Sequence, residues 1–204
     1  MPSKHLIDLL HRRPELAGSE KTIVQAYETL RTCFRSGGKL LLCGNGGSAA
    51  DADHWAGELL KSFCAERRLS KRARAGLRPA IAKQLEGALP AIPLTAFTAA
   101  ITAFGNDVDP HLAYAQLTHA LGRRGDVLAA LSTSGNAQNV CAAAEVARAR
   151  GLKVIALTGA SGGKLKARSD VCIRAPTAET YRAQEYHLPI YHCLSLMLED
   201  EFFS

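Results

Sequence analysis

Apolar and polar residues alternate along the chain in blocks that predict strands followed by helices. Short apolar runs bounded by turn residues predict buried strands, and apolar residues three or four positions apart predict helices. The predicted strands are Lys39–Cys43, Ala91–Phe97, Asp126–Leu131, Lys153–Thr158 and Asp170–Arg174. The predicted helices are Lys4–Leu10, Lys21–Phe34, Ala49–Phe63, Ala80–Ala88, His111–Leu121, Ala137–Arg150 and a last one from Thr180 to the chain end. Strands that alternate with helices indicate an α/β fold, in which helices cover both faces of a parallel sheet.

The composition fits one such domain and narrows the class of protein. The 204 residues are 47% hydrophobic, which is enough for a well-buried core. No apolar run approaches the ~20 residues that span a bilayer, and the first residues lack the features of a secretory signal, so we expect a cytoplasmic protein without a membrane partner. Six cysteines are scattered without a C-x-x-C pair. We expect reduced packing residues, not a disulfide framework or a zinc ribbon.

The formal net charge of +6 is concentrated in one segment. Six of the basic residues lie between Arg67 and Arg78, within a stretch, 64–90, that we interpret as a basic insertion or lid. A run of like charges is more often a solvated segment than a binding patch. No aromatic residues interleave with these charges and no recognition motif accompanies them, so a nucleic acid is an unlikely partner.

The stretch Lys39–Phe63 places a glycine-rich turn between the first strand and its helix. Glycines in the turn GNGGS let an anion approach the free N–H groups at the start of the helix, where Ser48 is expected to be the N-cap. In that helix His54 and Glu58 are four residues apart, so their side chains project from one face and can meet at one point. The sequence therefore predicts a phosphate cradle and a His/Glu pair on one element.

Two plainer interpretations of this stretch compete with that prediction. The letters from Gly44 to Ala49 match the dinucleotide fingerprint G-x-G-x-x-A. That fingerprint also needs a second strand soon after the helix, ending in an acidic residue, and a basic stretch follows here instead. The second interpretation is that His54 and Glu58 form only a solvated pair on the helix surface. The loops further along the chain favour the phosphate site.

Two more loops carry polar residues beyond the expected strand ends. In an open parallel sheet, ligands bind outside the carboxyl ends of the strands. Asn106 and Asp107 follow the second strand after a short excursion, and Ser132–Asn136 follows the third strand directly. The hydroxyls of the latter loop precede a helix N-terminus, whose dipole favours an anion. Two such loops without a Walker lysine pattern indicate a bound monophosphate, not a nucleotide.

These segments resemble those of a known family. The stretches LLLCGNGGSAADADHWAGEL, FGNDVD, LSTSGNAQNV, VIALTGASGG and ETYRAQEYHLPIYH are similar to sugar isomerase (SIS) domains, specifically to the phosphoheptose isomerases that act on sedoheptulose 7-phosphate. The resemblance runs from Lys21 to near the chain end. It implies one SIS domain over residues 1–204, with N-terminal helices in 1–37 and a C-terminal helix. The implied fold is a flavodoxin-like three-layer sandwich with a five-stranded parallel sheet, and the implied assembly is a homotetramer.

The resemblance also implies the site residues and a cofactor. The implied sugar-phosphate contacts are Asn45, Gly46, Gly47, Ser48, Glu58, Asn106, Asp107, Ser132, Thr133, Ser134 and Gln184. The implied zinc ligands are His54, Glu58, Gln184 and His192. Glu58 and His192 are the implied proton-transfer pair of an aldose/ketose isomerase, which moves a proton between adjacent carbons through an enediol. The alternative is a non-catalytic SIS-domain protein, either a phosphosugar-binding protein or a replication-initiation regulator. The family includes such a regulator, which binds the initiator protein and lacks the Glu/His pair.

Helix geometry adds an expectation about assembly. Gln184 and His192 are eight residues apart, which is about 12 Å along a straight helix and too far for both to bind one zinc. Either Pro189 distorts the helix, or the two residues serve different copies of the site. We favour the second, because a proline kink changes the direction of a helix more readily than its length. Glu58 and His192 of one working site are then expected to come from different subunits, and His187, on another helix face, to pack in the core.

Overall fold

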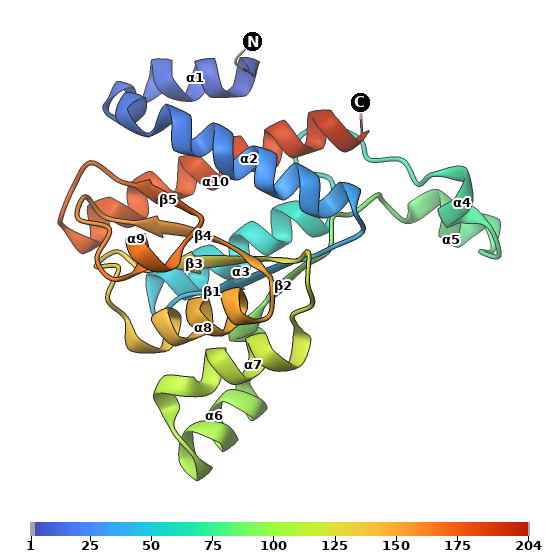
Figure 1. Cartoon of the computed structure of the whole chain (residues 1–204). Coiled ribbons are helices and arrows are strands. Elements are labelled where there is room, and N and C mark those ends of the chain that lie inside the picture. The colour runs from blue at the N-terminus through green and yellow to red at the C-terminus, as the bar shows by residue number, and fades with distance from the viewer. Residues whose placement is uncertain (1–2, 204) are drawn as a thin grey trace.

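A five-stranded parallel sheet forms the middle layer of the structure, a computed structural model that describes residues 3–203 (Figure 1). The strands are β1 (Leu40–Cys43), β2 (Ala91–Pro93), β3 (Val127–Leu131), β4 (Lys153–Thr158) and β5 (Val171–Arg174). They lie in the order β2-β1-β3-β4-β5, and every neighbouring pair is parallel. All five predicted strands are present, and the predicted α/β sandwich is confirmed.

Helices cover both faces of the sheet and enclose two hydrophobic cores. The helices of the first core are α1 (Lys4–Arg12), α2 (Glu20–Arg35), α3 (Gly47–Leu60) and α10 (Thr180–Phe203). Those of the second are α7 (Ala113–Leu121), α8 (Gln138–Ala149) and the short α9 (Leu165–Arg168). Strand β1 serves both cores, because alternate residues of a strand face opposite sides: Leu40 and Leu42 pack in the first core, Leu41 and Cys43 in the second. Within residues 3–203, no helix combines the length and hydropathy that a membrane span requires.

The region after the second strand differs from the prediction. Strand β2 ends at Pro93, four residues earlier than expected, and a turn of 3₁₀ helix, η2 (Leu94–Ala96), follows it. Proline has no N–H for the ladder, and β2 can contain one because it lies at the edge of the sheet. The stretch expected as a short excursion forms a further helix, α6 (Thr98–Asp107), which packs against α7 and the 3₁₀ turn η3 (Pro110–Leu112).

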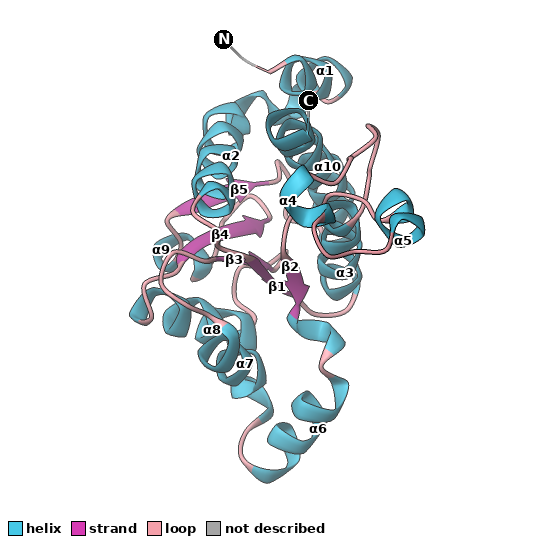
Figure 2. Cartoon of the chain, turned by 90° about the vertical axis from the view of Figure 1, so that its right-hand side faces the viewer, coloured by secondary structure: helices cyan, strands magenta, loops and turns pink. Residues whose placement is uncertain are grey.

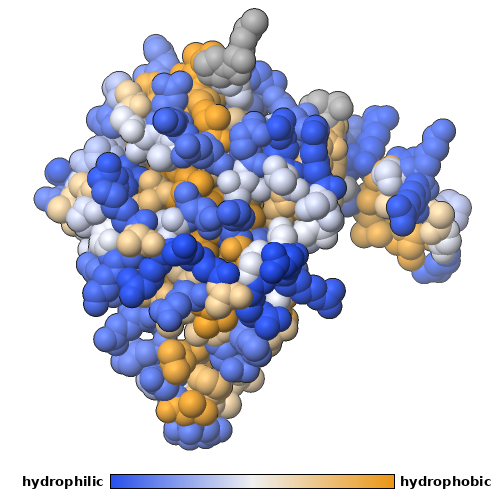
Figure 3. All heavy atoms as spheres, in the orientation of Figure 1, coloured by the Kyte–Doolittle hydropathy of each residue, from blue (hydrophilic) through white to orange (hydrophobic). Residues whose placement is uncertain are grey.

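The basic insertion forms an arm that leaves the body beyond the C-terminal end of α3 (Figure 1). It contains two short helices, α4 (Lys71–Arg74) and α5 (Pro79–Gln84), which Figure 2 views nearly end-on. The helix predicted over Ala80–Ala88 is therefore shorter. Figure 3 shows apolar residues on one side of the arm among charged ones. The exposed apolar residues of the arm are Leu77, Ile81 and Leu85.

Arg67 corrects the interpretation of the basic run as a solvated segment. Its side chain is fully buried, and its Nε donates to Glu199 Oε1 at 2.7 Å. The two remaining guanidinium nitrogens donate to the carbonyl oxygens of Glu58 and Leu59, at 2.8 and 2.9 Å. Arg67 thereby donates to carbonyls in the last turn of α3, of which that of Leu59 also accepts from the Leu89 N–H at 2.9 Å. One member of the basic run is a structural cation.

Glu199 completes this buried network from α10. Its two carboxylate oxygens accept three backbone N–H groups, those of residues 63, 64 and 65, each at 2.9 Å. Burial alone raises the pKa of Glu199, but these hydrogen bonds and the one from Arg67 outweigh it and hold the pKa below its usual value. The chain that leaves α3 is thus attached to α10 at the base of the arm.

His187 is fully buried in α10, as expected from its helix face. Its Nε2 lies 3.2 Å from the Thr158 carbonyl oxygen, to which an N–H there donates. Burial lowers the pKa of His187 from 6.5 to about 4, although the hydrogen bond to Thr158 acts in the opposite direction. The neutral imidazole is therefore part of the folded core.

We expect His187 to make the fold sensitive to acid. The unfolded chain takes up this proton below pH 6.5 and the folded chain only near pH 4, so stability falls between those values by about 3 kcal/mol. Replacing His187 by Gln keeps a donor for Thr158 and should flatten that part of the curve. The check is the free energy of urea unfolding from pH 7.5 to 4, with exposed His111→Gln as the control. An unchanged pH dependence in the His187 variant would contradict the assignment.

Candidate active site

The loops after β1 and β3 lie side by side at the carboxyl edge of the sheet, because these two strands are neighbours. Asn45 in the first loop and Asn139 in the first turn of α8 join them. Each side-chain amide donates to the oxygen of the other, at 2.8 and 2.9 Å. The loop that contains Ser132, Thr133 and Ser134 is thus tied to the glycine-rich loop, as the phosphate-site prediction requires.

The glycine-rich turn leads directly into α3. Helix α3 begins at Gly47, and its N-cap is Gly46, which has a positive φ of 56° that favours glycine. Ser48, expected to be the N-cap, instead lies inside the first turn and is buried. The backbone turns earlier than predicted because a glycine, not a serine, has the conformation that starts the helix.

Gln184 of α10 lies at the N-terminus of α3. A Cβ placed on Gly47 would be only 2.6 Å from Gln184 Nε2, so the missing side chain of this glycine leaves the room that the amide occupies. Gln184 therefore lies beside the glycine-rich loop that follows β1. Its position agrees with the implied role as a substrate contact.

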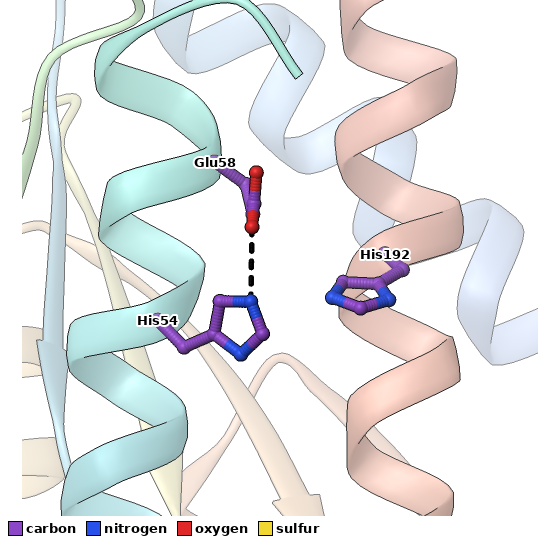
Figure 4. A group of neighbouring side chains, drawn as sticks. All are labelled: His54, Glu58 and His192. Atoms are coloured by element: carbon purple, nitrogen blue, oxygen red, sulfur yellow. Dashed lines mark hydrogen bonds and ion pairs between the residues drawn. The ribbon is translucent and has the colours of Figure 1, made fainter. Parts of the chain in front are cut away.

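His54, Glu58 and His192 form a cluster two helical turns further along the same pair of helices (Figure 4). His54 Nε2 lies 2.9 Å from Glu58 Oε1, and one ligand atom from each of the three residues lies within 4.8 Å of the others. The side chain of His54 is 46% exposed and that of Glu58 14%, so the cluster is reached from solvent on the His54 side. The predicted His/Glu pair is part of a larger constellation.

The donor set of this cluster suits a divalent metal. Two imidazoles and a carboxylate are ordinary zinc ligands. His192 Nε2 is buried and has no hydrogen-bond partner within residues 3–203, as expected of an atom that awaits a ligand. Burial lowers the pKa of His192, the nearby His54 lowers it further, and Glu58 opposes both. His192 is therefore a neutral imidazole near pH 7, which is the form that binds metals.

The expectation that Glu58 and His192 come from different subunits is wrong, because one chain brings them together. Helices α3 and α10 pack in parallel: Gln184 lies beside Gly47, and His192, two turns later, lies beside His54. Helix α10 is unbroken through Pro189. Gln184 and His192 therefore lie at two positions along the contact between α3 and α10, Gln184 beside Gly47 and His192 beside His54.

Asn106 and Asp107 are not brought to these loops within one chain. They lie at the exposed C-terminal end of α6, where Asn106 Nδ2 donates to Asp107 Oδ1 at 2.9 Å. Figures 1 and 2 place α6 at the end of the molecule away from α10. The unpredicted helix α6 carries them there, since the chain moves away from the sheet after β2.

Two residues that support the phosphate loops were not singled out from the sequence. Asn139 closely follows the S-T-S-G-N segment. Its position in the first turn of the predicted helix could have indicated that it lies near that loop. Tyr114 of α7 donates to the Gly44 carbonyl oxygen at 2.7 Å and fixes the start of the glycine-rich turn. Burial raises the pKa of Tyr114 to about 12, so it remains a donor. Nothing in the local pattern distinguishes this tyrosine from an ordinary core residue.

Comparison with known proteins agrees with this arrangement. A family model described as "SIS domain" matches residues 81–159. The phosphoheptose isomerase of Rhodospirillum rubrum is 41% identical over 182 residues, covering 89% of this chain and 87% of that protein. The phosphoheptose isomerase of Methylibium petroleiphilum is 45% identical over 177 residues, covering 85% and 79%. The structure of the phosphoheptose isomerase from Neisseria gonorrhoeae aligns with a TM-score of 0.77 and 36% identity over 96% of this chain and 95% of that one.

The sheet order, the paired loops after β1 and β3 and the matching family model define a domain of the sugar isomerase class. Relatives that align over most of their own length restrict the assignment further. The chain belongs to the phosphoheptose isomerase family.

Substituting Gly47 tests the position of Gln184. In Gly47→Ala the new Cβ displaces the flexible Gln184 amide, so we expect weaker binding of a sugar phosphate with nearly unchanged stability. Gly44→Ala places its Cβ 2.4 Å from the Ser48 backbone oxygen, which cannot move easily, and should destabilise the fold. Gly57→Ala has open space inside α3 and is the control, with unchanged binding and the slightly higher stability expected when alanine replaces glycine within a helix. Isothermal calorimetry and thermal unfolding measure both quantities. Undiminished binding of the sugar phosphate by Gly47→Ala would show that Gln184 does not contribute to substrate binding.

Proposed function

We propose that this protein converts sedoheptulose 7-phosphate into D-glycero-D-manno-heptose 7-phosphate. The observation that carries the proposal is the cluster of His54, Glu58 and His192 two helical turns from a pair of phosphate loops. A seven-carbon chain extends from its phosphate to the carbons that exchange a proton, and α3 carries the glycine-rich loop at its start and the cluster two turns later. The names of the relatives support the choice of this substrate.

The substrate phosphate is held at the sheet edge. Hydroxyls of Ser132, Thr133 and Ser134 and the backbone of Asn45–Ser48 surround it, where the N-termini of α3 and α8 face an anion favourably. Gln184 donates to the sugar from the opposite helix. These contacts bind and orient the substrate so that its carbonyl end reaches the cluster.

Glu58 and His192 move the protons. Isomerisation takes a proton from the carbon beside the carbonyl and returns one to the neighbouring carbon, through an enediol. The Glu58 carboxylate acts on the carbon-bound proton, and the neutral His192 imidazole exchanges protons with the oxygens. Both groups come from one chain, on facing helices, so their spacing is set by the packing of α3 on α10.

The cluster holds one zinc ion through His54, Glu58 and His192. Zinc polarises a carbonyl as a Lewis acid when it is bound next to one. A metal-bound carboxylate is a weaker base and a metal-bound imidazole nitrogen has no free lone pair for a proton, so the ligand and proton-transfer roles of Glu58 and of His192 compete. Gln184 lies at the phosphate end, so its implied role as a fourth ligand has less support than its role in substrate binding.

A single SIS domain over residues 1–204 assembles into a homotetramer in the cytoplasm. The exposed position of Asn106 and Asp107 on α6 supports shared sites, because it leaves their side chains accessible to another copy of the chain. All six cysteines are free thiols, as in reducing compartments. Residues 64–90 form the arm. A role as a lid would require the arm to move over the active site. Light scattering of the purified protein tests the assembly, and a monomer would contradict it.

Glu58→Gln separates chemistry from binding. The amide keeps the shape but is no base, so we expect turnover to be abolished while phosphosugar affinity stays within about tenfold. Sedoheptulose 7-phosphate and a panel of other phosphosugars are incubated with both proteins, and products are followed by NMR. Zinc content is measured in the same samples, which distinguishes loss of the base from loss of the metal. Binding without turnover by the wild-type protein would instead favour the non-catalytic role.

A further inference from the structure

Behind the metal cluster lies a chain of hydrogen bonds that neither the sequence nor the family names assign. The Tyr191 hydroxyl lies 3.0 Å from His54 Nδ1 and 3.3 Å from Asp51 Oδ1. Tyr191 thus contacts the His54 imidazole at Nδ1, whereas Glu58 contacts it at Nε2. Asp51 and His54 are one turn apart on α3, and Tyr191 precedes His192 on α10.

The phenol is held rigidly in this position. Tyr191 is fully buried and its ring stacks on that of Trp55, with centroids 5.7 Å apart and planes 17° from parallel. Its hydroxyl therefore has little freedom to find other partners. Asp51 Oδ2 is buried without a partner in the described part of the chain, so the Tyr191 hydroxyl is the donor on which this carboxylate depends.

The directions of these hydrogen bonds follow from the groups themselves. An ionised carboxylate only accepts, so Tyr191 donates its one proton to Asp51. The phenol oxygen is then an acceptor for His54, whose Nδ1 must carry the imidazole proton. A neutral imidazole has only one such proton. Nε2 is left with its lone pair, and it faces Glu58 Oε1 at 2.9 Å.

We propose that Asp51 and Tyr191 are positioning residues that fix His54 as the Nδ1–H tautomer and so present its Nε2 lone pair to a divalent metal. Two acceptors 2.9 Å apart repel each other, and a cation at about 2.1 Å from each removes that repulsion. The hydrogen bonds among Asp51, Tyr191 and His54 thus orient the His54 lone pair before a metal binds. This inference rests on the metal site of the proposed isomerase and adds the groups that orient one ligand.

The opposite arrangement is less favourable. If Nε2 carried the proton, it would donate to Glu58, and Tyr191 would have to donate to Nδ1. Asp51 would then lose the hydrogen bond to Oδ1, while its Oδ2 is already buried without a partner in the described part of the chain. A carboxylate removed from water without a hydrogen bond is strongly disfavoured.

The tautomer is measured directly by ¹⁵N NMR of the metal-free, full-length protein at alkaline pH, where imidazoles are neutral. We expect His54 to show a protonated Nδ1 in the wild type, with its signals assigned by their loss in His54→Gln. In Tyr191→Phe, Nδ1 loses its acceptor, so the proton should move to Nε2 and bond to Glu58. A wild-type signal from a protonated Nε2 would overturn the proposal.

Zinc affinity gives the second readout, through competition with a chelator. Loss of a group that orients a metal ligand typically weakens binding by about 10- to 100-fold, which we expect for Tyr191→Phe and Asp51→Leu. Asp51→Asn keeps an acceptor oxygen and should retain most of the affinity. Tyr27→Phe is the matched control, because it removes a phenol that donates to Glu201, away from the cluster.

The outcomes separate this inference from the proposed function. If the wild type isomerises its substrate and binds zinc, but Tyr191→Phe binds zinc equally well, the isomerase function is supported and the positioning role is contradicted. If the Nδ1–H tautomer and the affinity losses are found but no phosphosugar is converted, the positioning role is supported and the isomerase function is contradicted.

Discussion

The parallel packing of α10 on α3 is the contact on which the site depends. Both helices begin at the carboxyl edge of the sheet, so residues at matching depth along them face each other in pairs. Near the start, Gln184 occupies the space left by Gly47, and two turns later His192 meets His54. The stacking of Tyr191 on Trp55 fixes the distance between the helices at that depth. A shift of α10 by one turn would separate all these pairs at once.

Much of the fold followed from the hydrophobic pattern alone. The five strands are short apolar runs between turn residues, and burial on both faces leaves such runs little choice of structure. The i, i+4 pair of His54 and Glu58 was predictable because both lie on one helix, where spacing determines direction. The neighbouring phosphate loops were predictable because strand ends in a parallel sheet share an edge. These predictions use local geometry only.

The rest depends on tertiary contacts. Spacing shows how far Gln184 and His192 are from each other, but not which part of α3 each one meets, so the subunit assignment failed. Arg67 looks like its exposed neighbours in sequence, and only Glu199, 132 positions away, distinguishes it. Helix α6 forms where the sequence offered no clear period, and it carries Asn106 and Asp107 away from the loops. The contact of Tyr191 with His54 could not be predicted, because the sequence does not show which side of α10 faces α3.

The attachment of the arm has a consequence for how this chain tolerates change in length. The ion pair of Arg67 with Glu199 holds the base of the arm against α10, and the backbone bridge between Arg68 and Glu86 joins its two segments just beyond that point. Because the ends are held together, adding or removing residues between them costs only a slowly growing loop entropy. A change in length between Arg68 and Glu86 therefore leaves the end of α3, and with it Glu58, in place.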